Sequence, residues 1–274
     1  MSDVLRWKLL GSQRARPSQY HIVQLYQNVE FLSEVVGLYL QTGLEQGEGE
    51  IVVATAPHWR AFLQHLKTHR GEVTEAQARG QLIVLDAEDV LARIMPHRVL
   101  EEATFTQMIG GAIEEMRGPG RFRQIRIYGE LVNLLWEQRQ IATAIRLEEL
   151  WNGLAASQPF SLLCAYRMDN FSTDVHGPPL QGLCRTHSHL LPTEDDARLE
   201  QAVYSAMTDI LGVTQANTVR RLLKDRRLSA PVMPDAQVAL VWLKDNLPIM
   251  ANAILVRAER YYTQASPRGG LATS

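Results

Sequence analysis

The sequence is poor in cysteine, in net charge and in long hydrophobic runs. Only two cysteines occur among its 274 residues, which is too few for a disulfide framework and favours a reducing, cytoplasmic location. No apolar segment approaches the ~20 residues that a membrane-spanning helix needs, so we expect no membrane partner. A formal net charge of −2 provides no general attraction to nucleic acid or to an anionic membrane.

The sequence also lacks the motifs of common nucleotide-dependent and hydrolytic enzymes. A phosphate-binding loop needs glycines and a lysine, but the turn after the second predicted strand, residues 54–59, contains neither. No G-x-G-x-x-G motif follows a predicted strand, and no G-x-S-x-G motif occurs. We therefore expect no enzymatic activity and no cofactor. The alternative is a divergent ATPase in which Glu130 holds magnesium and Arg126 contacts phosphate.

Short apolar runs rich in β-branched residues alternate with amphipathic helical patterns along the first two thirds of the chain. The runs predict buried strands, which are residues 22–26, 51–55, 82–85, 125–128 and 160–166. Apolar residues recur at helical spacing between them, as from Phe31 to Leu40 and from Phe105 to Met116. This alternation predicts an α/β fold, with a mostly parallel sheet and helices on both faces.

After residue 192 the pattern becomes helical throughout. An apolar stripe runs from Leu199 to Ile210, and Thr214 can cap a second helix. A long third helix should begin near Pro234 and be kinked or split at Pro248. The predicted organisation is an N-terminal arm (1–16), an α/β domain (17–192), an all-helical C-terminal domain (193–266) and a flexible tail (267–274).

The ends of the predicted strands supply the first candidate ligand-binding residues. In parallel sheets, ligands bind beyond the carboxyl ends of the strands. This rule selects Thr55 and His58 after the second predicted strand, and Gly129 and Glu130 after the fourth. Aromatic residues near strand ends, such as Tyr26, either line an apolar pocket for a small ligand or belong to the core.

Cysteine and histidine gather near the end of the predicted α/β domain, where Cys184, His187 and His189 lie within six residues. Both residue types bind zinc, but this spacing matches no standard structural zinc site. We therefore expect no metal, and these three residues are the weak candidate ligands. Cys164 lies among apolar strand residues and is expected to be an inert core cysteine.

A basic cluster lies on or after the second predicted helix of the helical domain. A basic helix that follows a turn can dock on DNA, whereas a solvated helix face is the other interpretation. The weak candidates for nucleic-acid contact are Arg220, Arg221, Lys224 and Arg227. Because the chain has no net positive charge, DNA binding is not expected, and a DNA-binding transcriptional regulator is kept as an alternative function.

Several short segments occur in an order that resembles a known family. They are HIVQLY at 21–26, IYGE at 127–130, LEELWN at 147–152, LCAY at 163–166 and LCRTHS at 183–188. Over about residues 17–192 their order and spacing resemble the MEDS family, the sensory domain of methanogen and methylotroph regulators such as DcmR.

The resemblance implies a RecA/KaiC-like α/β fold without a working phosphate loop, and a role in prokaryotic signal transduction with small hydrocarbon derivatives as ligands. It also implies ligand-site candidates at the matching positions, which are His21, Tyr26, Gly129, Glu130, Glu148, Trp151, Asn152, Tyr166 and His187. Glu148 and Asn152 are four residues apart and should share one helical face. Helix packing is the alternative role for Glu148, Trp151 and Asn152.

We therefore expect a bacterial sensor or adaptor that binds a small ligand at the strand ends of its α/β domain, with a role in transcription regulation. Its helical C-terminal segment should signal to a protein partner or to a second copy of the chain. Domains of this family often accompany a helix-turn-helix or a kinase-like module, and the helical segment matches neither. A structural interaction module without a ligand is a further alternative.

Overall fold

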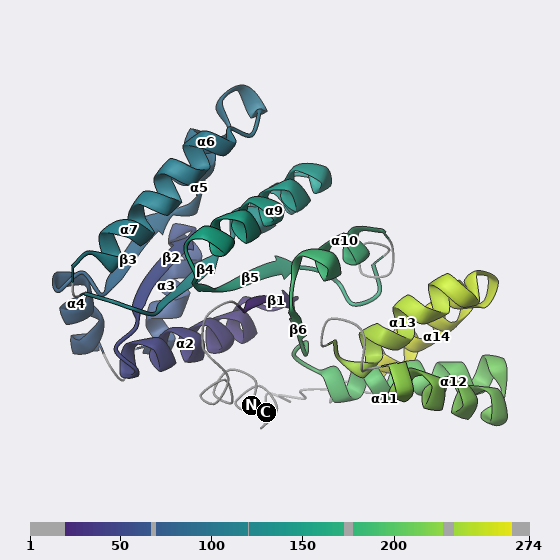
Figure 1. The fold of residues 1–274 in the computed structure, drawn as a ribbon. Helices are drawn as coiled ribbons and strands as arrows, with labels where there is room; N and C mark the ends of the chain where they lie inside the picture. The colour runs from purple at the N-terminus through teal and green to yellow at the C-terminus, as the bar shows by residue number, and fades with distance from the viewer. Residues whose placement is uncertain (1–19, 67–69, 120, 173–177, 227–232, 265–274) are drawn as a thin grey trace, which may run out of the picture. The chain divides into compact units, whose positions relative to one another are not determined.

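The structure is a computed structural model that describes residues 20–66, 70–119, 121–172, 178–226 and 233–264 (Figure 1). The chain divides into two compact units. The first runs to Met168 and also includes Gly182–Glu194, whereas the second comprises Asp169–Gln181 and the residues from Asp195 onward. The predicted arm (1–16) and tail (267–274) lie outside the described residues.

A six-stranded, all-parallel sheet forms the centre of the first unit, with strand order β3-β2-β4-β5-β1-β6. The strands are β1 (His21–Tyr26), β2 (Gly49–Ala54), β3 (Leu82–Asp86), β4 (Ile125–Gly129), β5 (Ser161–Arg167) and β6 (His189–Leu191). The α/β class and the parallel sheet predicted from the sequence are confirmed. β6 was not predicted, because three residues are too few to show an alternating pattern.

Helices connect the strands and cover both faces of the sheet (Figure 1). In chain order they are α2 (Val29–Glu45), α3 (Ala56–His65), α4 (Arg70–Ala78), α5 (Ala87–Ile94), the short η3 (Pro96–Arg98), α6 (Glu102–Phe105), the π-helical turn η4 (Thr106–Gly110), α7 (Gly111–Arg117), α8 (Leu131–Glu137), α9 (Ile141–Ser157) and α10 (Pro178–Thr186). The Asn28 side chain caps α2 by accepting a hydrogen bond from the Glu30 N–H at 2.8 Å. α2 continues past the predicted apolar stripe, which ends at Leu40, and stops at Glu45.

Alternation along the strands sorts their side chains onto the two faces of the sheet. Ile22, Tyr26, Tyr128, Leu163 and Ala165 belong to a core cluster that includes buried residues of α2 and α3. The intervening side chains of β1 and β5 point to the opposite face, which α9 covers (Figure 1). The sheet therefore separates two environments, and each contains part of the predicted site.

The second unit is a bundle of four main helices, α11 (Asp196–Leu211), α12 (Val213–Arg226), α13 (Asp235–Asn246) and α14 (Pro248–Gln264). Its core is apolar and comprises, among others, Leu199, Val203, Met207, Leu240, Leu243 and Ile254. The predicted helical segment and the split at Pro248 are confirmed. The predicted cap is wrong, because α12 begins at Val213 and Thr214 lies inside its first turn.

Within the second unit, the ring of Phe171 packs against Tyr262 of α14 at a centroid distance of 5.5 Å. Among the described residues, no helix is both long enough and apolar enough to cross a membrane.

Candidate functional site

The candidate site residues form two groups, both in the first unit. One group gathers around Glu130 at the carboxyl ends of the strands, on the face that contacts α2 and α3. The other gathers around Glu148 of α9 on the opposite face. The sequence predicted most members of both groups but not their separation, because the order of the strands cannot be read from local patterns.

In the first group, Glu130 follows β4 and is almost completely buried. One oxygen, Oε1, accepts a hydrogen bond from the Thr55 backbone N–H. The other, Oε2, lies 2.6 Å from His58 Nδ1 and accepts a hydrogen bond from the Tyr128 hydroxyl at 3.1 Å. Both oxygens of this carboxylate therefore already have partners within the protein.

Electrostatics in this group follow from the Glu130 carboxylate. Its hydrogen bond raises the pKa of His58, against the opposing effect of burial. Burial raises the pKa of Tyr26, and the charge of Glu130 raises it further. The Tyr26 ring contacts His58 at a centroid distance of 6.3 Å. This arrangement favours a neutral phenol at Tyr26 and a protonated imidazole at His58.

The connections at this edge differ from a phosphate-binding loop. β1 is joined to α2 by Gln27 and Asn28, and β2 is joined to α3 by Thr55 alone. Neither connection contains a glycine, and Asn28 is used as the cap of α2. These two turns therefore offer no glycine-rich cradle for a phosphate.

Arg126, the phosphate contact of the alternative ATPase hypothesis, lies toward the other end of β4. Its buried guanidinium group pairs with Glu48, and it stacks over the Tyr39 ring at 5.1 Å. Three strand residues, 127–129, lie between it and Glu130, which places the two residues roughly 13 Å apart along the strand direction. The structure therefore does not bring these two side chains together.

The second group surrounds Glu148, which is completely buried in the middle of α9. His21 Nε2 lies 3.0 Å from its Oε2, and His187 Nε2 lies 3.4 Å from its Oε1. The Tyr166 hydroxyl donates to Oε1 at 2.5 Å, and Cys164 Sγ lies 3.5 Å from Oε2. The carboxylate thus stands among two imidazoles, a phenol and a thiol.

The sheet topology explains how distant segments reach this point. Cys164 and Tyr166 are two residues apart on β5, so both point to the face that α9 covers. β1 pairs with β5 on one side and with β6 on the other. His21 opens β1, and His187 lies between α10 and β6.

The two imidazole rings are oriented by hydrogen bonds through their Nδ1 atoms. His21 Nδ1 is 2.9 Å from Asn152 Oδ1, and His187 Nδ1 is 2.7 Å from the Leu183 carbonyl oxygen. Because both acceptors lack a hydrogen, each Nδ1 must carry the proton. Asn152 is held in turn, since its Nδ2 donates to the Thr186 carbonyl oxygen at 2.8 Å. Both Nε2 atoms are therefore turned toward Glu148.

The pKa values of the side chains in this group differ from their ordinary values. Burial alone would raise the pKa of Glu148, but the charges and hydrogen bonds of His187 and His21 outweigh it and hold that pKa below its usual range. Burial, together with His21, lowers the pKa of His187. Burial and the Glu148 charge raise the pKa of the Cys164 thiol. The group therefore contains a buried carboxylate beside a protonated thiol.

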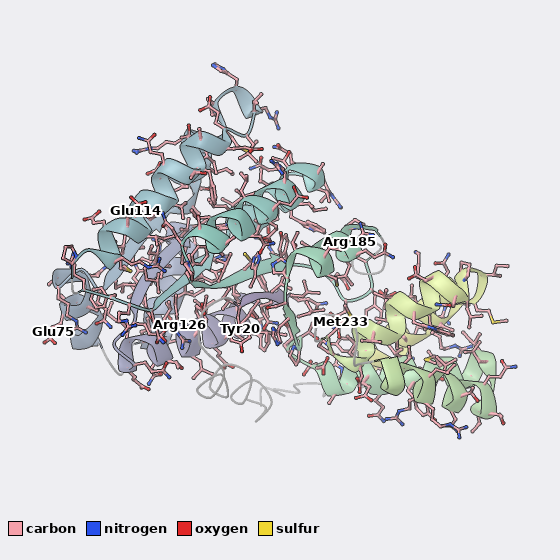
Figure 2. The ribbon with its side chains drawn as sticks, in the orientation of Figure 1. Tyr20, Glu75, Glu114, Arg126, Arg185 and Met233 are labelled. Atoms are coloured by element: carbon pink, nitrogen blue, oxygen red, sulfur yellow. The ribbon has the colours of Figure 1, made fainter. Side chains whose placement is uncertain are left out.

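A cavity of about 330 Å³ adjoins this second group at the amino ends of β1 and β5. Its lining is mostly aromatic and aliphatic, and consists of Tyr20, His21, Trp151, Asn152, Ala155, Ala156, Phe160 and Leu162. Figure 2 labels Tyr20, which immediately precedes β1. His21 and Asn152 belong to both the cavity wall and the Glu148 group. The cavity thus lies at the end of the sheet opposite to the strand ends that the sequence selected.

Two of the remaining candidates pack against each other in the interior. A Cβ atom on Gly129 would lie 3.4 Å from the Trp151 ring, so the indole packs directly over this position of β4. Trp151 also makes edge-to-face contacts with Phe105 and Phe160. In the described residues, Gly129 serves packing, and Trp151 serves both packing and the cavity wall.

The weak metal candidates separate in the structure. His187 joins the Glu148 group, whereas Cys184 and His189 lie outside it. Burial raises the pKa of Cys184 to about 11, and His189 Nδ1 lies 3.0 Å from Ser188 Oγ. Cys164 was missed as a site residue because its neighbours are apolar. The available signal was its spacing, because residues two apart on a strand, such as Cys164 and Tyr166, point to the same face of the sheet.

The weak nucleic-acid candidates are only partly described. Arg220 pairs with Glu200 at 3.2 Å and stacks over the Tyr204 ring at 4.7 Å. Arg221 is exposed on α12. The side chain of Lys224 and all of Arg227 lie outside the described residues. The guanidinium group of Arg220 therefore contacts side chains of the helical bundle itself.

A comparison with known families matches residues 20–188 to the MEDS model, described as "MEthanogen/methylotroph, DcmR Sensory domain". The matched segment spans more than half of the chain and contains both groups of candidate residues, from His21 to His187. No curated protein matches the chain.

Proposed function

Because the chain belongs to the MEDS family of sensory domains, we propose that it is a signal-transduction protein whose α/β unit detects a small organic molecule. The cavity beside His21 and Asn152 is the observation that supports this proposal. A volume of about 330 Å³ lies at the lower end of the range for ligand pockets. The ligand is therefore expected to have few heavy atoms.

The lining of the cavity suggests the chemistry of the ligand. Aromatic and alanine side chains supply apolar surface, while His21 and Asn152 supply polar groups, and the lining exposes polar and apolar atoms in similar amounts. Such a combination suits a small hydrocarbon derivative with one hydrogen-bonding group. This expectation agrees with the ligands that the family resemblance implies.

The hydrogen bonds around the cavity suggest how binding is reported. A ligand that contacts Asn152 competes with its bonds to His21 and to the Thr186 carbonyl group at the end of α10. The chain passes from one unit to the other within α10, between Gln181 and Gly182. We expect a change in α10 to alter the helical unit, which then signals to a protein partner or to a second copy.

A thermal-shift screen of the full chain tests this function. The panel contains small alcohols, acids and halogenated hydrocarbons, with ATP, ADP and cyclic dinucleotides as comparison compounds. A compound that binds only the folded state should raise the unfolding temperature in proportion to RT ln(1 + [L]/Kd). Turnover of ATP would support the alternative enzymatic function and contradict a purely sensory role.

A matched pair of variants locates the ligand. Ala155→Leu should fill part of the cavity and abolish the stabilisation, because Ala155 belongs to its wall. Ala142→Leu makes the same change on an exposed position of the same helix and should leave the stabilisation intact. An active compound that stabilises both variants equally binds outside the cavity.

A further inference from the structure

We propose that the α/β unit binds one divalent transition-metal ion, of the zinc type, through four buried side chains, which are His21, Glu148, Cys164 and His187. One potential ligand atom from each residue lies within 4.8 Å of the other three. Imidazole, thiolate and carboxylate are the three kinds of ligand that proteins use for zinc.

The dimensions of the cluster fit a tetrahedral ion. Zinc bonds of about 2.0–2.1 Å to nitrogen and oxygen and about 2.3 Å to sulfur place neighbouring ligand atoms roughly 3.3–3.6 Å apart. His21 Nε2 is 3.0 Å from Glu148 Oε2 and 3.4 Å from Cys164 Sγ, and that sulfur is 3.5 Å from the same oxygen. A metal ion can therefore be enclosed with only small side-chain movements.

The hydrogen bonds of His21 and His187 turn the Nε2 atoms of both rings toward Glu148. Both imidazoles donate through Nδ1 to carbonyl oxygens, which is the arrangement that metal-binding histidines use to orient the other nitrogen. His187 Nε2 is buried and has no hydrogen-bond partner. A buried ring nitrogen that faces a carboxylate without a hydrogen bond needs either a proton of its own or a metal ion between the two groups.

The thiol cannot satisfy this group alone. Cys164 carries one hydrogen but faces both His21 Nε2 and Glu148 Oε2. A divalent ion satisfies all four groups, and its charge balances one thiolate and one carboxylate, so the loaded site is electrically neutral. Burial disfavours net charge. A neutral loaded site is therefore compatible with these surroundings.

Metal binding has a defined proton balance. The ion binds the thiolate form of Cys164, so the thiol proton is released to the solvent when the metal binds. The apparent affinity should therefore fall as the pH is lowered. His21 also borders the cavity, which gives the ion a route from the solvent.

Titration of the chelator-treated full chain with Co²⁺, followed by displacement with Zn²⁺, tests the site. We expect one equivalent of Co²⁺ to bind, with the sulfur-to-metal charge-transfer absorption of a thiolate ligand and the visible bands of a tetrahedral complex. Cys164→Ser should remove the charge-transfer absorption. Cys184→Ser changes the only other cysteine and should leave the spectrum unchanged.

Three further variants separate metal binding from folding. His187→Gln should abolish one-to-one binding, whereas His189→Gln, at a histidine outside the cluster, should not. Asn152→Ala, which removes the partner of His21, should weaken the affinity about 10–100-fold. Circular dichroism of the metal-free variants shows whether each remains folded.

The proposal is overturned if the folded wild-type chain binds no Co²⁺ or Zn²⁺ at one equivalent, or if Cys164→Ser leaves the spectrum unaltered. A cluster that is satisfied by protons alone would give the first result. Cys164 does not line the cavity, so its substitution leaves the proposed organic-ligand site in place. The metal proposal and the sensory proposal can thus fail separately.

Discussion

Removal of one hydroxyl group from the interior should show how strongly the Glu148 carboxylate depends on its neighbours. The Tyr166 hydroxyl is completely buried and donates to Glu148 Oε1 at 2.5 Å. A hydrogen bond to a charged group contributes about 1.5–3 kcal/mol. Tyr166→Phe also keeps the ring and its edge-to-face contact with Trp136. We therefore expect the free energy of unfolding to fall by about 1.5–3 kcal/mol.

Tyr39→Phe is the matched control for this change. The Tyr39 hydroxyl is also buried, but it donates to a neutral acceptor, the Ser161 carbonyl oxygen, at 3.0 Å. A bond of this kind contributes about 0.5–1.5 kcal/mol. The two variants thus differ chiefly in the charge of the acceptor.

Urea unfolding of the metal-free protein, monitored by tryptophan fluorescence, measures both losses. The slope of the free energy of unfolding against urea concentration should be unchanged in each variant, because a hydroxyl deletion hardly alters the surface exposed on unfolding. Equal losses for Tyr166→Phe and Tyr39→Phe would refute the reasoning. Glu148 would then not act as a charged acceptor in the folded protein.

Two further predictions concern pH and packing. The carboxylate partner of His58 raises its pKa in the folded state, so its stabilising effect is complete below the ordinary pKa of about 6.5 and is lost as the pH rises through the folded value. His58→Asn should therefore lower the free energy of unfolding more at pH 5.5 than at pH 9, and an equal loss at both would count against the pair. Gly129→Val should cost about 1–3 kcal/mol because it overpacks the adjacent indole ring. Gly153→Ala on α9 meets no atom within 4 Å and should stabilise by up to about 1 kcal/mol, as thermal unfolding can check.

Local patterns were sufficient to predict most of the fold. Short apolar runs predict buried strands. The split at Pro248 follows from the missing N–H group of proline. Glu148 and Asn152 were correctly expected on one face of a helix, because four residues complete about one helical turn. These features depend only on residues that are close in the sequence.

The Glu148 group depends on contacts that no local pattern contains. His21 and Cys164 are 143 residues apart and meet only because β1 pairs with β5. Strand order is a property of the whole sheet, so the sequence suggested one ligand site at the strand ends, whereas the structure has two separate groups. Cys164 was expected to be inert because its chain neighbours are apolar, whereas its spatial neighbours are polar.

The position of β1 in the sheet also affects how the protein is made. β1 precedes the other five strands of the sheet along the chain, yet its two partners are β5 and β6, which come last among the six. One edge of β1 therefore stays unpaired until translation has passed Arg167, and the other until it has passed Leu191. Pairings between such distant segments form slowly, and an apolar strand with two free edges can associate with other chains. The nascent chain should consequently need shielding by a chaperone until β5 and β6 have been made.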